Sequence, residues 1–386
     1  MLHLLHQLVK EVPVRKAMKI IGIITVAVVA VVGIVVAVIL HKTVLVEHPE
    51  LEGKPEIGEW YRISPEGTKS SDSSEWHGLL KLGTENKVAV YFFGGGVSIN
   101  GYTSERGKEF FATTAQIQDF VASGGISSDD ERNPFKDWTF LVLPYASGDF
   151  HSGTGTYRYM DGDQEKAVYH NGYENYSAFM EAAKYYVGEP DTLLVTGFSA
   201  GGFATSLLAD DVIDRFPSAE NVTVNVDSAL LLYDDWHETA TDLWQSPKVI
   251  SDRLTSNNLV LDSLTALHQK RGDSVKILFD CSYRDDTLQQ YQEFIRNGAM
   301  NVDKESGDRF QKDLAEMVSE LQKNIPNIGV YIWNYGADSD TGNTQHTIIS
   351  SNVFDELEEG KSVAEWIHDA VNGKIESYGL DLLHNS

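Results

Sequence analysis

Hydrophobic residues along this chain form one long run near the N-terminus and a series of short runs after it. Residues 20–40 consist only of Ile, Val, Ala, Gly, Leu and one Thr. As a helix rising about 1.5 Å per residue, this run would span roughly 30 Å, the thickness of a bilayer's hydrocarbon layer. A core helix is seldom this long without a polar residue, and a cleaved signal peptide usually has only about 7–15 apolar residues. Residues 20–40 are therefore predicted to be a transmembrane signal-anchor helix in the lipid bilayer.

The charges on either side of this run predict its orientation. Residues 1–19 carry several Lys and Arg residues and a single acid, Glu11, whereas residues 41–75 are rich in Glu. The positive-inside rule keeps the basic flank in the cytosol and places the rest of the chain outside the cell membrane. Residues 41–75 also contain many Pro, Gly and Ser residues, so we expect a stalk there. An exported chain with one cysteine suggests a bacterial cell surface.

From residue 76 onward, short β-branched runs alternate with longer amphipathic segments. Strands are expected at 88–93, 139–144, 192–196, 222–226, 275–279 and 328–333, and helices at 108–122, 174–187, 200–213, 309–323 and 363–371. This alternation predicts one α/β domain over residues 76–386, with a mainly parallel sheet and helices on both faces. Such sheets carry their chemistry at the carboxyl ends of the strands. Residues 228–272, with two tryptophans, are expected to form a cap insertion over that edge.

Composition and charge exclude several classes of protein. The chain has 386 residues with a net charge of −26, and its first 42 residues are basic, so the remainder is more acidic still. A body this acidic repels phosphate backbones, so no nucleic-acid partner is expected. The single Cys281 excludes an intramolecular disulfide and a multi-cysteine metal site. Acidic turns at 161–163 and 338–340 do not complete a calcium loop, so neither a metal nor a cofactor is expected.

The sequence Gly197-Phe198-Ser199-Ala200-Gly201 fits the G-x-S-x-G pattern of serine hydrolases. It directly follows a predicted strand and opens a helix of small residues, which is the setting of a nucleophile elbow. An ordinary glycine-rich turn would be the alternative. The setting favours Ser199 as a catalytic nucleophile.

A nucleophilic serine needs a base, and the base needs an acid that orients it. In α/β-hydrolases the acid follows the serine in sequence and the histidine comes last. His346 lies past the last predicted strand, whereas His368 falls in a predicted helix and His384 in the tail. For the acid, the loop after strand 275–279 offers Asp286 as first choice and Asp285 as the alternative. A solvated acidic loop with no catalytic role is the other interpretation of this stretch.

An oxyanion hole needs two backbone N–H groups aimed at one point. One is expected from Ala200, at the start of the helix after the nucleophile. The other is expected from the glycine-rich turn at 94–97, where Gly95 would let the backbone approach the substrate. Asp149 and His151, in the loop after another strand, are expected to line the substrate pocket, or else to satisfy a local turn.

Together these segments resemble the pectin acetylesterase and Notum family of α/β-hydrolases. The similar stretches are 91–97, 143–153, 196–202, Asp286 with Gln289, and His346 by its place. The resemblance implies a triad and a set of oxyanion donors: Ser199, Asp286 and His346 for the first, and Gly96, Val97 and Ala200 for the second. Val97-Ser98 stands where the family has tryptophan and cysteine, and the family's many eukaryotic disulfide cysteines are absent.

The sequence thus predicts a membrane-anchored extracellular serine esterase that removes acyl groups, foremost acetyl, from a polysaccharide. Its negative charge disfavours a polyanion such as de-esterified pectin, so a neutral or heavily esterified glycan is the expected substrate. A lipase-like or peptidase-like hydrolase with the same triad is one alternative. A surface protein that binds a glycan without cleaving it is another.

Overall fold

The computed structural model describes residues 47–384. The predicted cytosolic segment 1–19 and transmembrane helix 20–40 lie outside these residues. Within the part of the chain that is described, none of the helices has the length and hydrophobicity needed to cross a membrane.

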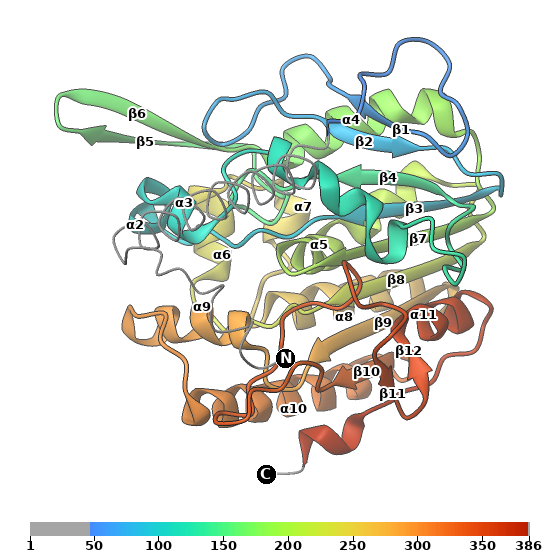
Figure 1. Ribbon diagram of the computed structural model, residues 1–386. Helices are drawn as coiled ribbons and strands as arrows, with labels where there is room; N and C mark the ends of the chain where they lie inside the picture. The colour runs from blue at the N-terminus through green and yellow to red at the C-terminus, as the bar shows by residue number, and fades with distance from the viewer. Residues whose placement is uncertain (1–46, 385–386) are drawn as a thin grey trace, which may run out of the picture. The chain divides into compact units, whose positions relative to one another are not determined.

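An eight-stranded sheet forms the centre of the domain, in the order β1-β2-β4-β3-β7-β8-β9-β10 (Figure 1). All neighbouring strands from β4 to β10 run parallel, and only β1 and β2 are antiparallel to their neighbours. The bounds of these strands are Trp60–Ile63 (β1), Gly78–Lys81 (β2), Lys87–Phe92 (β3), Thr139–Leu143 (β4), Thr192–Phe198 (β7), Asn221–Asp227 (β8), Val275–Ser282 (β9) and Gly329–Trp333 (β10). The predicted mainly parallel sheet is confirmed, and its inner strands are buried because helices cover both faces.

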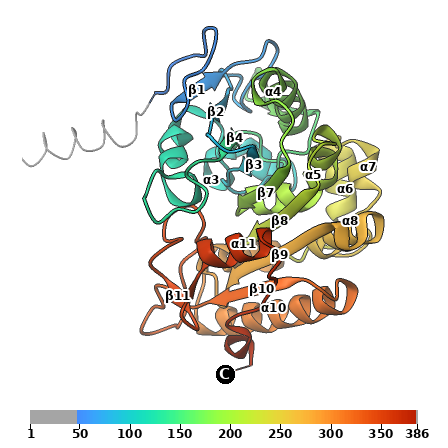
Figure 2. The same cartoon turned by 90° about the vertical axis from the view of Figure 1, so that its right-hand side faces the viewer.

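Helices pack on both faces of the sheet (Figure 2). The larger core joins the sheet to α4 (Gly172–Val187), α5 (Ala200–Arg215), α8 (Leu259–Arg271) and α10 (Lys304–Asn324). The second core joins the other face to α11 (Val363–Val371) and the 3₁₀ helices η1 (Gln116–Ser123) and η2 (Gly125–Ser127). The remaining helices are α2 (Gly101–Glu105), α3 (Gly107–Phe110), α6 (Trp236–Glu238), α7 (Lys248–Ser251), α9 (Asp286–Asn297), the π-helix η3 (Thr239–Leu243), η4 (Gly272–Ser274) and η5 (Leu380–Leu383).

Two small hairpins complete the secondary structure. β5 (Gly155–Asp161) pairs with β6 (Gln164–His170), and β11 (Leu357–Glu358) pairs with β12 (Lys361–Ser362). The β5–β6 hairpin extends from the body on the side of the sheet where α2 and α9 lie (Figure 1).

The prediction of a stalk at 41–75 is wrong from residue 47 onward. This stretch contains β1, which pairs with β2 at the edge of the sheet and buries Trp60 and Ile63. Arg62 in the same strand donates to the buried carboxylate of Asp119 at 2.7 and 2.9 Å. A four-residue edge strand flanked by charged residues leaves little periodicity in the sequence, so composition alone suggested a linker.

Two further expectations need correction. The predicted helix at 108–122 is interrupted, because Phe111 forms a bridge with Gly96 between α3 and η1. In the predicted cap at 228–272, α8 is a regular helix of the layer that packs against α5, and only residues 228–258 leave the layer. Trp236 and Trp244 of that excursion are fully buried rather than exposed as in a lid.

Candidate active site

Ser199 lies on a strained turn between β7 and α5, as predicted. Its φ of 55° and ψ of −127° belong to a region that costs a non-glycine residue on the order of 1–3 kcal/mol. The flanking glycines make this turn possible: a Cβ on Gly197 would lie 2.3 Å from the carbonyl oxygen of Gly201, and one on Gly201 would lie 2.0 Å from that of Phe92. The sequence therefore forms a nucleophile elbow at the carboxyl end of β7.

His346 forms a hydrogen-bonded pair with Asp285. Its Nδ1 lies 2.7 Å from Oδ2 of Asp285, whose side chain is 0% exposed, while that of His346 is 15% exposed. The carboxylate of Asp285 also caps α9 by accepting the N–H of Leu288 at 2.8 Å. This arrangement holds the imidazole in one tautomer, with the proton on Nδ1 and Nε2 free to act as a base.

The prediction of Asp286 as the triad acid is therefore wrong, and its alternative Asp285 takes the position. Asp286 is the first residue of α9, and its carboxylate accepts a hydrogen bond from Thr287 next to it. A residue at the N-cap directs its side chain back across the helix start, whereas the next residue already follows the helix. The sequence signal that could have decided this was the capping preference of the Asp285 position.

Burial and charge act on this pair in opposite directions. Burial raises the pKa of the Asp285 carboxyl, and the charge of His346 and their hydrogen bond oppose that rise. Burial lowers the pKa of His346, but the charge of Asp285 and the hydrogen bond to it outweigh burial, so this pKa lies above its ordinary value. Asp227 and Asp286 raise the pKa of His346 further through their charges.

Nε2 of His346 is buried and has no hydrogen-bond partner among the described residues. It is consequently not hydrogen-bonded to the Ser199 hydroxyl in this structure. Catalytic hydrogen bonds are often long or misaligned without substrate and tighten when substrate binds. The free Nε2 is the atom that a nucleophile's proton would reach.

The glycine-rich turn at 94–97 borders the nucleophile, but its backbone groups are not equally available. The N–H of Val97 donates to the carbonyl oxygen of Phe110 at 3.0 Å, so the predicted donor role of Val97 is not supported. Gly96 has a φ of 79°, and a Cβ there would lie 2.0 Å from the same oxygen, which requires glycine. Ala200 opens α5, where a first-turn N–H has no partner within the helix. Gly96 and Ala200 are thus the candidate oxyanion donors.

A narrow cavity of about 10 Å³, partly open to solvent, lies at Ser199. Its lining combines the glycine-rich turn, Ser199 and a mostly apolar wall: Gly96, Val97, Phe150, Ser199, Ala200, Phe203, Leu231, Thr287, Leu288 and Tyr291. The wall comes from four separate segments, so no local sequence pattern identified it. Gly95, predicted to bind substrate, is absent from this lining.

Asp149 and His151 do not line the cavity, contrary to the prediction. Both are buried, at 0% and 2% exposure. Asp149 accepts hydrogen bonds from the Ser147 hydroxyl and from the backbone N–H groups of Gly153 and Gly172, and a ring nitrogen of His151 lies 3.0 Å from the carbonyl oxygen of Phe93. The alternative, a turn that satisfies only local backbone, holds in part, because Gly172 and Phe93 lie far from this loop in sequence. This loop holds Phe150, the residue between them, in the cavity wall.

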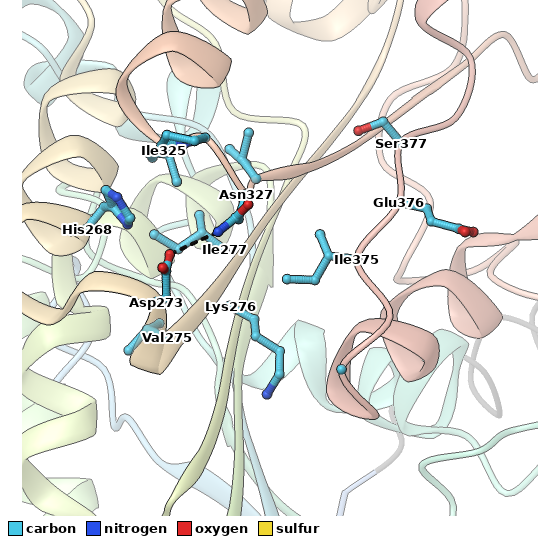
Figure 3. A pocket seen from close by; sticks show the side chains of 13 residues that line it. His268, Asp273, Val275, Lys276, Ile277, Ile325, Asn327, Ile375, Glu376 and Ser377 are labelled. Carbon is cyan, nitrogen blue, oxygen red and sulfur yellow. Dashed lines mark hydrogen bonds between the residues drawn. The ribbon is translucent and has the colours of Figure 1, made fainter.

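A larger hollow lies at the opposite ends of the strands (Figure 3). It is lined by residues at the amino ends of β9 and β10, among them Lys276 and a hydrogen-bonded pair, Asp273 and Asn327, at 3.1 Å. It contains neither Ser199 nor His346. The chemistry of this fold is expected at the carboxyl ends, so the cavity at Ser199 is the candidate active site.

Comparisons with known proteins indicate the family and the fold. Residues 81–246 match the sequence family described as Pectinacetylesterase, a stretch that includes the oxyanion turn and the nucleophile elbow. No curated protein matches the chain in sequence. The Wnt deacylase Notum from Drosophila has a similar structure, with a TM-score of 0.59 and 16% sequence identity over 82% of this chain and 94% of that one. At this identity the structural similarity shows the fold.

Asp285 and His346 lie beyond the part of the chain that matches the family. Their pairing is seen in the structure, as the hydrogen bond between Nδ1 of His346 and Oδ2 of Asp285. The family match and the shared fold confirm the resemblance predicted from the sequence: this chain is similar to the pectin acetylesterase and Notum family, and it is a carboxylic ester hydrolase.

Proposed function

We propose that this protein is a serine esterase in which Ser199, His346 and Asp285 act as a catalytic triad. The observation that carries the proposal is the 2.7 Å hydrogen bond that Nδ1 of His346 donates to Oδ2 of Asp285, while Nε2 of the same ring has no partner among the described residues. The three residues follow β7, β9 and β10, whose carboxyl ends meet at one edge of the sheet.

In the first half of the reaction, the Ser199 hydroxyl attacks the carbonyl carbon of the ester. Nε2 of His346 takes the hydroxyl proton, and the buried carboxylate of Asp285 stabilises the resulting imidazolium. The carbonyl oxygen becomes an oxyanion, which accepts hydrogen bonds from the N–H groups of Gly96 and Ala200. His346 then returns the proton to the departing alcohol as the C–O bond breaks, and the acyl group remains on Ser199.

In the second half, water replaces the alcohol. His346 takes a proton from the water, whose oxygen attacks the acyl-enzyme carbonyl. The same two N–H groups stabilise the second oxyanion. The Ser199–acyl bond then breaks, the serine recovers its proton from His346, and the carboxylic acid leaves.

The cavity favours a short acyl group. Phe150, Phe203 and Leu231 form its apolar wall, and Tyr291 is fixed by a 2.6 Å hydrogen bond from its hydroxyl to the carbonyl oxygen of Phe110. The space left between these walls is only about 10 Å³, which leaves no room for an extended fatty acyl chain, so the proposed acyl group is a short one, foremost acetyl. These walls support acetyl ester hydrolysis over the lipase-like alternative.

An acetylated polysaccharide is the proposed substrate. The family description supports acetyl esters on a glycan, and the net charge of −26 disfavours approach of a free polyuronate at low ionic strength. A neutral or heavily esterified glycan avoids this repulsion.

We further propose that residues 20–40 anchor the enzyme in the cell membrane, with residues 1–19 in the cytosol and the esterase domain outside. The support is the apolar run and the basic flank of the sequence. Membrane fractionation, followed by protease treatment of intact cells, tests this topology. We expect the protease to remove the esterase domain from intact cells. Full protection of the domain from the protease would contradict the proposal.

The function is tested with p-nitrophenyl acetate and p-nitrophenyl octanoate on the purified full-length chain. We expect faster hydrolysis of the acetate and its loss in Ser199→Ala. Ser339→Ala, at an exposed serine far along the chain, should retain activity and serves as the control. Equal activity in Ser199→Ala would disprove the serine mechanism, and glycan binding without hydrolysis would favour the non-catalytic alternative.

A further inference from the structure

Asp227 connects the nucleophile elbow to the neighbouring strands. It is the last residue of β8, in register with Phe198 of β7 and Asp280 of β9. Its carbonyl oxygen accepts the N–H of Ser199 at 2.9 Å. A Cβ on Gly202 would lie 2.4 Å from the same oxygen, so a glycine there lets the first turn of α5 approach it closely. The main chain of Asp227 is thus part of the turn that presents the nucleophile.

The side chain of Asp227 holds a different segment, the one that follows His346. Its Oδ2 accepts the N–H groups of Ile348 and Ile349, each at 3.1 Å, and its Oδ1 accepts the hydroxyl of Ser228 at 2.6 Å. The residue between His346 and Ile348 is Thr347, with a φ of 62°. A left-handed residue next to successive N–H groups directs them at one point, where they bind an anion.

We propose that Asp227 is a positioning residue that fixes the distance between His346 and Ser199. It does so by accepting hydrogen bonds from backbone N–H groups of both segments at once. The proposal rests on the esterase function proposed above. Three backbone hydrogen bonds to this one residue connect β8 with the elbow and with the histidine loop.

Burial and hydrogen bonds act in opposite directions on the charge of Asp227. Asp280, beside it on β9, is fully buried, and burial together with the charge of Asp227 raises its pKa well above the usual range. Burial also raises the pKa of Asp227, and hydrogen bonds from Ser228, Ile348 and Ile349 oppose this. The pKa of Asp280 is thus raised further than that of Asp227, whose anionic form receives the backbone hydrogen bonds. Tyr91 on β3 faces both carboxyls and stays neutral because burial raises its pKa.

Asp227→Asn in the full-length chain tests the proposal. Asparagine keeps the shape and one acceptor oxygen, but it places an N–H₂ group where an acceptor is needed. We expect kcat for p-nitrophenyl acetate to fall roughly 10- to 100-fold with KM nearly unchanged, because small displacements of a base cost rates of this order. The acid limb of the pH profile should move to lower pH, since the charge of Asp227 raises the pKa of His346.

Asp149 offers a matched control. It too is 0% exposed, with one serine hydroxyl, that of Ser147, on Oδ1 and two backbone N–H groups, those of Gly153 and Gly172, on Oδ2. Asp149→Asn should lower the melting temperature as Asp227→Asn does, yet leave kcat within about threefold and the acid limb in place. Equal loss of stability in both variants, with unchanged kcat and pH profile in Asp227→Asn, would overturn the proposal.

A second readout separates this proposal from the esterase function. In the Ser199→Ala background, NMR titration of the His346 ring, assigned with His346→Gln, reports its pKa without any turnover. Asp227→Asn should lower this pKa by roughly half a unit to one unit. If the wild type hydrolyses neither ester but the titration shifts, the esterase function fails and the connection through Asp227 stands. If hydrolysis depends on Ser199 but the titration is unchanged, the connection fails and the function stands.

Discussion

The ring of Phe150 stacks on that of Phe203, with centroids 4.3 Å apart and planes 8° from parallel. Phe203 belongs to the first turn of α5, directly after the nucleophile, and both rings line the cavity at Ser199. Trp244 packs against the edge of Phe150 at 5.4 Å and backs this wall. The stack thus forms part of the apolar wall of this cavity.

Phe150→Ala should therefore lengthen the acyl chain that the enzyme accepts. We expect the ratio of octanoate to acetate hydrolysis to rise by about tenfold or more, since each accommodated methylene contributes roughly 1 kcal/mol or more. Truncation of a buried phenylalanine also costs about 3–5 kcal/mol of stability. Rates of both esters, measured on the same preparation below its melting temperature, give the ratio.

Phe179→Ala provides the control for that experiment. Phe179 is as deeply buried as Phe150, but it lies on α4 and does not line the cavity. It should lose comparable stability while the ratio of the two esters stays the same. A similar change of ratio in both variants would mean that loosened packing, and not the wall, alters the selectivity.

Asp285→Asn and Asp286→Asn should differ sharply. Asparagine at 285 can still cap α9, but its amide cannot accept the Nδ1 proton of His346 and favours the wrong tautomer. A loss of about 10³- to 10⁴-fold in kcat is expected, as for such replacements in other triads. Asp286→Asn should stay within about threefold, because that side chain bonds only Thr287. The reverse order of effects, measured as kcat with p-nitrophenyl acetate, would reassign the acid.

Much of this site was predictable from the sequence, because its signals are local. Ser199 could be predicted because a strand, a glycine-flanked serine and a helix of small residues are contiguous in the chain. His346 follows from its place after the last strand of a parallel sheet. The choice between Asp285 and Asp286 depended on where α9 begins, and helix starts are the least certain part of any sequence reading.

The features that sequence reasoning missed depend on contacts between distant segments. Asp149 and His151 have residue types typical of binding sites, but their partners are backbone groups of the domain interior. Phe150, between them, stacks on the ring of Phe203 in α5 and so forms part of the cavity wall. No spacing in the sequence shows that contact. Residues 47–75 likewise join the sheet through pairing with β2 and a bond to Asp119.

Gly96→Ala should strongly reduce activity. Gly96 has a φ of 79°, and a methyl group there would meet the Phe110 carbonyl oxygen at 2.0 Å, which would move the candidate oxyanion N–H. Loss of one oxyanion donor lowers kcat by about 10²- to 10³-fold. Gly162→Ala is the matched control, because Gly162 has a similar φ of 63° but open space around it. It should keep full activity, at a cost of about 1–2 kcal/mol in stability. Retained activity in Gly96→Ala would exclude this turn from the oxyanion hole.

The pH dependence of hydrolysis should report the raised pKa of His346. Only the neutral ring can accept the Ser199 proton, so kcat/KM should rise with pH through a midpoint above the ordinary value of 6.5. In Asp285→Asn the main charge that raises this pKa is removed, so the residual activity should show a lower midpoint than the wild type. A wild-type midpoint below 6.5 would contradict the pairing.

The same raised pKa predicts how stability changes with pH. The folded protein binds the His346 proton more tightly than the unfolded chain, so this residue's contribution to the free energy of unfolding is complete below about pH 6.5. It is lost as the pH rises through the folded pKa, because the neutral ring no longer gains from the charge of Asp285. Denaturant unfolding of wild type and His346→Gln between pH 5 and pH 9 measures this difference. The advantage of the wild type should shrink with increasing pH, and an advantage that grows instead would show that His346 is held neutral by burial.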